Sequence, residues 1–266
     1  MRLLHPSWDF SHPVVIGMLH LPPLPGAPLS RMQFRDVQDA VLRDAVALAK
    51  GGVDGLMMEN FGDVPFLPGR VSATTVAHMT ALACAVRKEV EPPLGINVLR
   101  NDGSSALAIA HATGANFIRV NVLCGARVTD QGLIQGIAHE LLRERAILGA
   151  DDVKILADVD VKHSAPLAER PLEDEVEDLI HRALADAVIV SGAGTGKATD
   201  PEMVRRVKEA AGETPVLVGS GVTSQTAGTL RDYADGFIIG TAFKKDGVAT
   251  NAVELERVTS LMRAIR

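Results

Sequence analysis

Aromatic residues make up only 3% of this 266-residue chain, which has a single Trp and a single Tyr. Because hydrophobic residues nevertheless amount to 47%, the core must be packed mainly with Val, Ile, Leu and Ala. Aliphatic packing of this kind suits parallel strands that are buried on both faces. With 23% charged residues, the composition is typical of a globular protein that can bury a full core.

Three further absences exclude classes of protein. Cys84 and Cys124 are too few for a disulfide framework and suit a reducing compartment, so we expect a cytoplasmic protein. No run of about 20 apolar residues occurs and the first residues lack a signal-peptide pattern, so no membrane span is expected, although peripheral association with a membrane stays open. The net charge of −6, without a cluster of Lys and Arg, argues against a nucleic-acid partner.

Short apolar runs alternate with segments of helical periodicity along the chain. After an irregular lead-in over residues 1–13, strands are predicted within 14–21, 55–60, 94–100, 117–123, 154–162, 187–191, 215–222 and 235–244. Helices are predicted within 35–50, 71–89, 104–113, 133–148, 172–184, 201–211, a short segment after residue 222, and 252–266. Eight such units without a break predict one (β/α)8 TIM-barrel domain over residues 1–266 rather than an open doubly wound sheet.

The last two strand predictions end in glycine turns. Gly219, Ser220 and Gly221 follow the seventh apolar run, and Gly240 and Thr241 follow the eighth. Glycine lets the backbone approach an anion closely, and a helix that starts nearby adds the positive end of its dipole. The last loops of a (β/α)8 barrel often hold a phosphate group in this way. We therefore predict that these five residues bind phosphate; in the alternative interpretation, the glycines only form tight turns.

Polar residues also stand where the other apolar runs end, and in such a barrel these positions face the active site. Burying charges without partners is costly or shifts their pKa values, so we expect them to pair with one another or with a ligand. The predicted catalytic residues are Lys162, Asp160, Asp158, Glu59 and His20. The predicted substrate-binding residues are Asn60, Asn97, Arg100, Arg119, Asn121 and Ser191. In the structural alternative, Arg119 only pairs with Asp158 across the barrel interior.

The fifth apolar run holds the densest set of these groups. Along an extended strand, Asp158, Asp160 and Lys162 would share one face, where two carboxylates and an ammonium group can transfer protons. The trio superficially resembles the Asp-x-Lys-x-x-Asp signature of the orotidine phosphate decarboxylase group. Because Ala165 stands in the place of the second aspartate and the motif lies on strand five, that activity is not carried over.

Three alternative interpretations concern these residues and two other segments. Glu59, Asp158 and Asp160 could bind a divalent metal with His20, but no tight ligand spacing supports a metal site, and no nucleotide cofactor is evident, so the cofactor stays unknown.

The segment Ser191–Lys197 departs from the P-loop pattern, which requires Gly at 191 and Ser or Thr in place of Ala198. It is interpreted as a flexible lid or a third phosphate contact. Cys124 could act as a nucleophile with His20 or His163 as its base, but a lone structural thiol is the more common case.

The chain resembles the BtpA family over nearly its whole length. Two segments and the two glycine turns at 219–221 and 240–241 carry the resemblance. The segments are Ile16–Gly26, which contains the most specific element, His-Leu-Pro-Pro-Leu-Pro-Gly, and Gly55–Gly62. The resemblance implies a barrel of the ribulose-phosphate-binding type and a role in photosystem I biogenesis in cyanobacteria. Members of the family also occur in organisms without photosystems, and no established reaction comes with the resemblance. The prolines after His20 would hold its imidazole at the barrel mouth, or would only brace a long first loop.

The leading hypothesis is an enzyme that acts on a small phosphorylated metabolite, such as a sugar phosphate or a nucleotide-like compound. Its reaction would be an isomerisation, a carbon–carbon cleavage or a glycosidic cleavage by acid–base chemistry. The competing hypothesis is a non-catalytic assembly factor for a membrane protein complex, which an extended apolar patch outside the barrel mouth would favour. We also expect a homo-oligomer that forms through an unpaired helix face.

Overall fold

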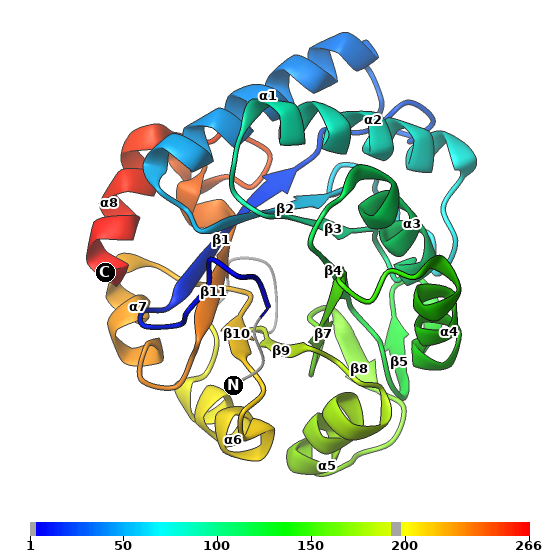
Figure 1. The fold of residues 1–266 in the computed structure, drawn as a ribbon, viewed down its shortest axis with the longest axis vertical. Coiled ribbons are helices and arrows are strands. Elements are labelled where there is room, and N and C mark those ends of the chain that lie inside the picture. The colour runs from blue at the N-terminus through cyan, green and yellow to red at the C-terminus, as the bar shows by residue number, and fades with distance from the viewer. Residues whose placement is uncertain (1–3, 193–197) are drawn as a thin grey trace.

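The computed structural model describes residues 4–192 and 198–266. Eight parallel strands close into a barrel in the order β1-β11-β10-β9-β7-β4-β3-β2, which confirms the predicted (β/α)8 fold (Figure 1). These strands are β1 (Val14–His20), β2 (Gly55–Glu59), β3 (Leu94–Asn97), β4 (Phe117–Val120), β7 (Lys154–Asp158), β9 (Ala187–Val190), β10 (Val216–Val218) and β11 (Gly236–Ile239).

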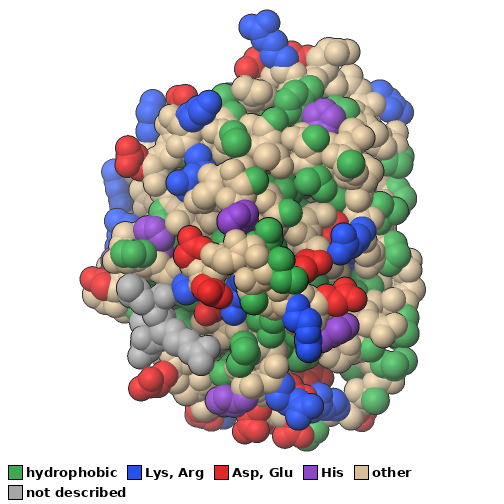
Figure 2. All heavy atoms as spheres, turned by 45° about the vertical axis from the view of Figure 1, so that its right-hand side comes forward, with side chains coloured by type: hydrophobic (Ala, Val, Ile, Leu, Met, Phe, Trp, Pro, Cys, Tyr) green, Lys and Arg blue, Asp and Glu red, His purple; other side chains and the backbone are tan. Residues whose placement is uncertain are grey.

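The helices form a ring outside the strands (Figure 1). They are α1 (Phe34–Gly51), α2 (Ala73–Glu89), α3 (Gly103–Thr113), α4 (Ala138–Leu148), α5 (Leu172–Glu177), α6 (Pro201–Ala211), α7 (Ser224–Leu230) and α8 (Leu255–Ile265). Within the described ranges, none of them is long and apolar enough to cross a membrane. On the face drawn in Figure 2, basic and acidic side chains are interspersed and hydrophobic ones are scattered among them.

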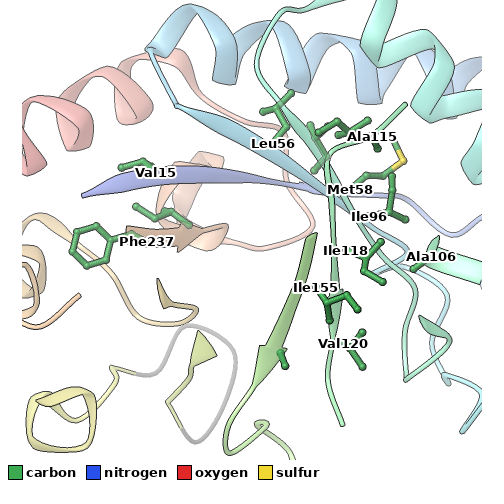
Figure 3. Packing of buried hydrophobic residues seen from close by; sticks show 14 of the residues in the cluster. Val15, Leu56, Met58, Ile96, Ala106, Ala115, Ile118, Val120, Ile155 and Phe237 are labelled. Carbon is green, nitrogen blue, oxygen red and sulfur yellow. The ribbon is translucent and has the colours of Figure 1, made fainter. Parts of the chain in front are cut away.

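Side chains alternate along each strand between the barrel interior and the surrounding helices. The outward residues, among them Val15, Leu56 and Ile118, belong to one large cluster with buried helix residues (Figure 3). The inward residues form a second cluster that includes Met18, Met57, Phe117, Leu156, Ile189, Leu217 and Ile238. The barrel is therefore a packed core rather than a pore, and a ligand can enter only at one of its ends.

The lead-in, described from residue 4 to residue 13, forms no helix or strand but packs into the barrel at the N-terminal ends of the strands. The Trp8 ring lies 5.6 Å from the Phe117 ring, centroid to centroid, and its indole N–H donates to the Asp54 carbonyl over 2.9 Å. A Cβ on Gly95 would overlap the Phe117 ring, so glycine is required there. Because this end is closed, the opposite, C-terminal end is left for a site.

Two segments depart from the predicted pattern. The chain after β4 forms a small antiparallel sheet in the order β6-β5-β8, made of β5 (Ala126–Thr129), β6 (Gly132–Gln135) and β8 (Ser164–Pro166). The helix predicted from residue 133 therefore begins only at Ala138, since residues 132–135 pair with β5. The strand predicted to reach residue 162 ends at Asp158, because the chain then turns towards β5 and pairs there as β8.

Candidate active site

Three predicted site residues lie side by side where β1, β2 and β3 end. His20 is the register partner of Glu59, and Glu59 is the register partner of Asn97. The Asn97 amide donates to Glu59 Oε2 over 2.6 Å, and Glu59 Oε1 lies 3.9 Å from His20 Nε2. The period of two that places Met18 and Met57 inside the barrel therefore also brings His20 and Glu59 together above them.

The imidazole of His20 is fixed from three sides. Its ring stacks on Phe61 at a centroid distance of 4.4 Å, and its Nδ1 lies 3.3 Å from the carbonyl oxygen of Ala249. A Cβ on Gly240 would lie 2.7 Å from His20 Cε1, so glycine leaves the space that the ring occupies. Burial lowers the pKa of His20 more than Glu59 raises it, which favours the neutral ring. A carbonyl only accepts, so Nδ1 carries the proton and Nε2 can act as a base.

A second network surrounds Asp158. Arg119 donates to its two oxygens over 2.9 and 2.7 Å, Asn121 donates over 2.7 Å, and the Ser191 hydroxyl lies at 3.3 Å. Arg119 and Asp158 are each only 3% exposed. Burial alone would lower the pKa of Arg119, but the Asp158 carboxylate raises it above its ordinary value. Arg119 and Asp158 thus form the ion pair expected in the structural alternative, and Arg119 and Asn121 also line the cavity above.

The C-terminal end of the barrel holds a cavity of about 1210 Å³. Small-molecule sites usually measure roughly 300–1,000 Å³, so the cavity has room for a metabolite. Many of the predicted site residues line it: His20, Glu59, Arg100, Arg119, Asn121, Lys162, Gly219, Ser220, Gly221, Gly240 and Thr241. Apolar residues of the loops that follow β1 and β2 line another part of the wall: Leu21, Pro22, Pro23, Phe61, Val64 and Phe66.

The two glycine turns meet at this cavity after β10 and β11. Gly219 continues the inward-facing row of its strand, and a Cβ there would lie 3.0 Å from the Ser191 hydroxyl. Gly221 has a φ of +65°, a conformation that side-chain-bearing residues rarely adopt. Its carbonyl accepts from the Thr226 hydroxyl over 3.0 Å, which braces the turn against α7. Packing therefore accounts for glycine at 219 and 240, whereas Gly221 is required by the backbone itself.

Arg100 and Lys162 approach the cavity from the loops after β3 and β7. Arg100 Nη2 donates to the Lys162 carbonyl over 2.6 Å, so the two residues are held next to each other. Arg100 is 5% exposed and Lys162 is half-buried. Burial lowers the pKa of both groups, and the positive charge of Arg119 lowers that of Lys162 further.

The expectation that Asp160 shares a face with Asp158 and Lys162 is wrong. Because β7 ends at Asp158, the alternation of an extended strand does not continue through residue 162. The Asp160 carboxylate instead pairs with Arg127 of β5 and is not among the residues that line the large cavity. A catalytic role for Asp160 thus finds no support in its position.

Asn60 also lies behind the cavity wall rather than on it. Its Oδ1 accepts from the backbone N–H of Leu99 over 2.7 Å, and its Nδ2 donates to Asp63 over 3.2 Å. These bonds join the loops after β2 and β3. Asn97 and Asp158 do not line the cavity, but they bind residues that do, Glu59 in one case and Arg119 and Asn121 in the other. Ser191 lies outside the wall as well and donates to Asp158.

The alternatives from the sequence fare differently. In the described part of the chain, no three His, Cys, Asp or Glu side chains are close enough together to hold a metal ion, so the proposed metal ligands are not assembled. Cys124 Sγ lies 3.7 Å from the Asp178 carbonyl and lines a separate cavity of about 300 Å³. Burial and then the Asp178 carboxylate raise the pKa of the Cys124 thiol, which disfavours the nucleophilic thiolate. Of the suggested lid, residues 193–197 lie outside the described residues.

One buried ion pair at the cavity was missed in the sequence. Lys244, which follows β11, donates to Asp44 of α1 over 2.7 Å, and the lysine is only 1% exposed. Asp44 also accepts from the backbone N–H of Val253 over 3.0 Å, so the pair fixes the loop between β11 and α8 to α1. A signal was present, because Asp44 falls on the helix face that carries Val41 and Leu48, where a charge requires a partner.

These features define a TIM-barrel protein with a cavity at the C-terminal end of its strands that is lined by apolar residues and by ionisable groups. Solved structures share the fold. The tryptophan synthase structure from M. tuberculosis aligns with a TM-score of 0.62 at 18% identity, over 99% of this chain and 97% of that one. N-(5'-phosphoribosyl)anthranilate isomerase from Pyrococcus furiosus aligns with a TM-score of 0.58 at 12% identity, over 96% and 98% of the two chains. At these identities the likeness concerns the fold alone.

The chain belongs to the BtpA family, whose model matches residues 11–266. It is 50% identical to an uncharacterized protein of Thermococcus kodakarensis, over 96% of this chain and 95% of the relative. It is 46% identical to the photosystem I biogenesis protein BtpA of Synechocystis sp., over 96% of this chain and 88% of that protein. An uncharacterized mitochondrial protein of Caenorhabditis elegans is 34% identical, over 96% and 94% of the two chains.

Proposed function

We propose that the protein is an enzyme that acts on a small phosphorylated metabolite by acid–base chemistry. The observation that carries this proposal is that one cavity is lined both by the two glycine turns after β10 and β11 and by ionisable groups from five other strands and the loops that follow them. A scaffold protein gains nothing from buried charges that face a cavity, since their burial is costly. Fold neighbours whose names refer to a phosphorylated compound, such as the phosphoribosylanthranilate isomerase, agree with this class of substrate.

In this proposal the phosphate group lies against the backbone of Gly219–Gly221 and Gly240–Thr241. Gly221, at a φ of +65°, turns the chain so that successive N–H groups can face one anion. The absence of a Cβ at these turns lets the phosphate oxygens approach the backbone closely. The rest of the substrate then extends over the floor formed by His20 and Glu59, which line the same cavity.

The chemistry assigned to the floor is proton transfer. Burial lowers the pKa of His20 and so favours the neutral ring, whose Nε2 accepts a proton from a substrate carbon or hydroxyl, and Glu59 at 3.9 Å stabilises the imidazolium ion that results. Lys162, whose pKa is lowered by burial, donates a proton or polarises a carbonyl oxygen at the opposite wall. A base and an acid on opposite sides of one substrate suit an isomerisation, a carbon–carbon cleavage or a glycosidic cleavage.

The test is a thermal-shift and calorimetry panel of sugar phosphates and nucleotides against their dephosphorylated counterparts. A ligand at about one hundred times its Kd stabilises a protein by roughly 2.7 kcal/mol, which is readily measured. Gly221→Asp should abolish the response to phosphate esters because its carboxylate repels the anion, and the uncharged Gly221→Asn should weaken it less.

The matched control is Gly149→Asp, which ends α4 away from the cavity at a φ of +64°. It adds the same charge in the same backbone conformation and should respond as wild type does. A panel in which phosphate esters shift the melting point no more than their dephosphorylated forms would refute the proposal.

A second candidate function, an assembly factor for a membrane protein complex, is favoured by the name of the Synechocystis relative. The small sheet also exposes Val128 and Leu133, which are directly opposite each other on β5 and β6 and lie outside the large cavity. The two candidates are distinguished by expressing variants in cells from which the gene has been deleted. If the protein is an enzyme, Leu133→Lys should restore the wild-type phenotype and Gly221→Asp should not. The reverse result would support the assembly factor.

A further inference from the structure

Arg100 and Lys162 are two adjacent cationic residues of the cavity wall, and the side chain of neither forms an ion pair within the described residues. Within residues 4–192 and 198–266, no carboxylate lies within 4.0 Å of either side chain, and Arg100 Nε has no hydrogen-bond partner. The other buried cations of the wall are matched, since Arg119 binds Asp158 and Lys244 binds Asp44.

Placing two positive charges together and burying them is unfavourable. A buried ion without a partner costs several kcal/mol, and like charges repel more strongly where water is scarce. Burial is the main cause that lowers the pKa values of Arg100 and Lys162, and Arg119 lowers both further, whereas the more distant carboxylates of Asp158 and Glu59 raise them without offsetting the burial. An oxyanion placed between them would remove the penalty and could accept from a guanidinium and an ammonium group at once.

The strand order separates this pair from the glycine turns. Going round the barrel, β10 and β11 are adjacent, β7 and β4 follow β9, and β3 lies beyond them. Arg100 follows β3 and stands across the mouth from both glycine turns, whereas Lys162 follows β7, which lies three strands from β11 and is separated from β10 by β9. One phosphate bound at the glycine turns therefore leaves the positive charge of the opposite wall unmatched.

We propose that Arg100 and Lys162 form a second oxyanion subsite, so that the substrate is a small molecule with an anionic group at each end. The inference rests on the proposed function, because it takes the phosphate at the glycine turns as the first anion. The second group is a carboxylate or another phosphate, which share the chemistry of an oxyanion. The carbons between them then lie above His20 and Glu59.

Three five-carbon probes test the proposal by isothermal titration calorimetry. Ribose 5-phosphate has one anionic end, 5-phosphoribonate adds a carboxylate, and ribose 1,5-bisphosphate adds a phosphate. Charge-assisted hydrogen bonds contribute enough for the second anion to tighten binding to the wild-type protein about 10- to 100-fold. The stronger of the two dianions identifies the second group.

The same titrations are repeated with Arg100→Gln and Lys162→Met. Each variant should lose most of the advantage of the dianions while its affinity for ribose 5-phosphate changes less than about threefold. Arg43→Gln is the control, because Arg43 is an exposed cation that lines the cavity from α1. It should keep the advantage. Far-UV circular dichroism and unfolding curves establish that each variant is folded, and Lys162→Met serves as the main test if loss of the buried Arg100 impairs folding.

Proton uptake gives an independent readout. The groups that face Lys162 are Arg119, Glu59, Asp158 and Arg100, and a bound anion adds a negative charge that raises the pKa of the lysine. The affinity for 5-phosphoribonate is therefore full below the pKa of Lys162 in the free protein and falls as pH rises through its pKa in the complex. Above the phosphate pKa of about 6, Lys162→Met should remove this dependence.

The outcomes separate the two proposals. Equal affinity for all three probes overturns the second subsite and leaves the phosphometabolite enzyme standing. The subsite is also overturned if Arg43→Gln removes the affinity advantage of the dianions as fully as Arg100→Gln does, because the advantage would then reflect general attraction by positive charge. Failure of all three esters to bind overturns the subsite for five-carbon substrates, and the proposed function is overturned separately, by the wider panel of sugar phosphates and nucleotides.

Discussion

The buried pair of Arg119 and Asp158 provides the sharpest test of how this barrel is held together. Asp158 accepts two hydrogen bonds from Arg119, one from Asn121 and a longer one from Ser191, and neither member of the pair is more than 3% exposed. Asp158→Asn removes the negative charge and leaves a guanidinium group sealed inside the barrel. Breaking one partner of such a pair typically costs about 3–5 kcal/mol.

That loss is a large fraction of the roughly 5–15 kcal/mol by which domains are usually stable. At about 2–4 °C per kcal/mol for a chain of this size, the expected fall in Tm is roughly 6–20 °C. The measurement is urea and thermal unfolding followed by circular dichroism. Glu59→Gln is the matched control: Glu59 is also buried in the same ring, but its Oε2 accepts from the neutral amide of Asn97, and glutamine can still accept there. Its cost should stay near 1 kcal/mol.

A double-mutant cycle separates the charge from the packing. Arg119→Met combined with Asp158→Asn contains no buried charge at this position, so it should regain much of the stability that Asp158→Asn loses. The reasoning would be refuted if the free energy of unfolding of Asp158→Asn lay within about 1 kcal/mol of the wild-type value. It would also be refuted if the double variant lost more free energy of unfolding than the two single variants lose together.

Three further variants test separate parts of the structure. Trp8→Ala should lower the free energy of unfolding by about 3–5 kcal/mol in urea titrations, because it empties the closed end of the barrel beside Phe117. Gly240→Ala should displace the imidazole of His20, with a Cβ at 2.7 Å from it, and cost about 1–3 kcal/mol; an unchanged imidazole NMR signal would contradict this. Lys244→Met leaves the Asp44 carboxylate on α1 buried without its counter-ion, so the free energy of unfolding should fall by about 3 kcal/mol. A midpoint of urea unfolding equal to that of wild type would contradict this expectation.

The parts of the fold that the sequence predicts are those in which local periodicity and barrel geometry act together. Eight aliphatic runs of short, regular spacing have few alternatives to a closed parallel sheet, and the structure confirms them. The same alternation places His20, Glu59 and Arg119 on inward positions directly above an apolar layer. For these residues the sequence position along a strand is enough to predict the side of the sheet.

Prediction fails where contacts between distant segments decide the path of the chain. Asp160 and Lys162 continue the alternating pattern of β7 in sequence, yet hydrogen bonds from β8 to β5 turn the chain away after Asp158. Arg127, the partner of Asp160, is 33 residues away in sequence. No window of local sequence contains both members of such a pair, so periodicity cannot reveal it. The pairing of Arg100 with the Lys162 carbonyl is hidden for the same reason, since these residues are separated by 62 positions.

The glycine turns show how one residue type can satisfy two requirements that a sequence does not distinguish. Gly219 and Gly240 would be needed even if no ligand bound, because a Cβ would meet Ser191 in one case and His20 in the other. Their presence therefore supports a phosphate site less than it first suggests. Gly221 differs, since its positive φ reflects the path of the turn itself. Substitutions at Gly221 thus separate anion binding from packing, whereas any side chain at 219 or 240 disturbs the packing of the floor whether or not phosphate binds there.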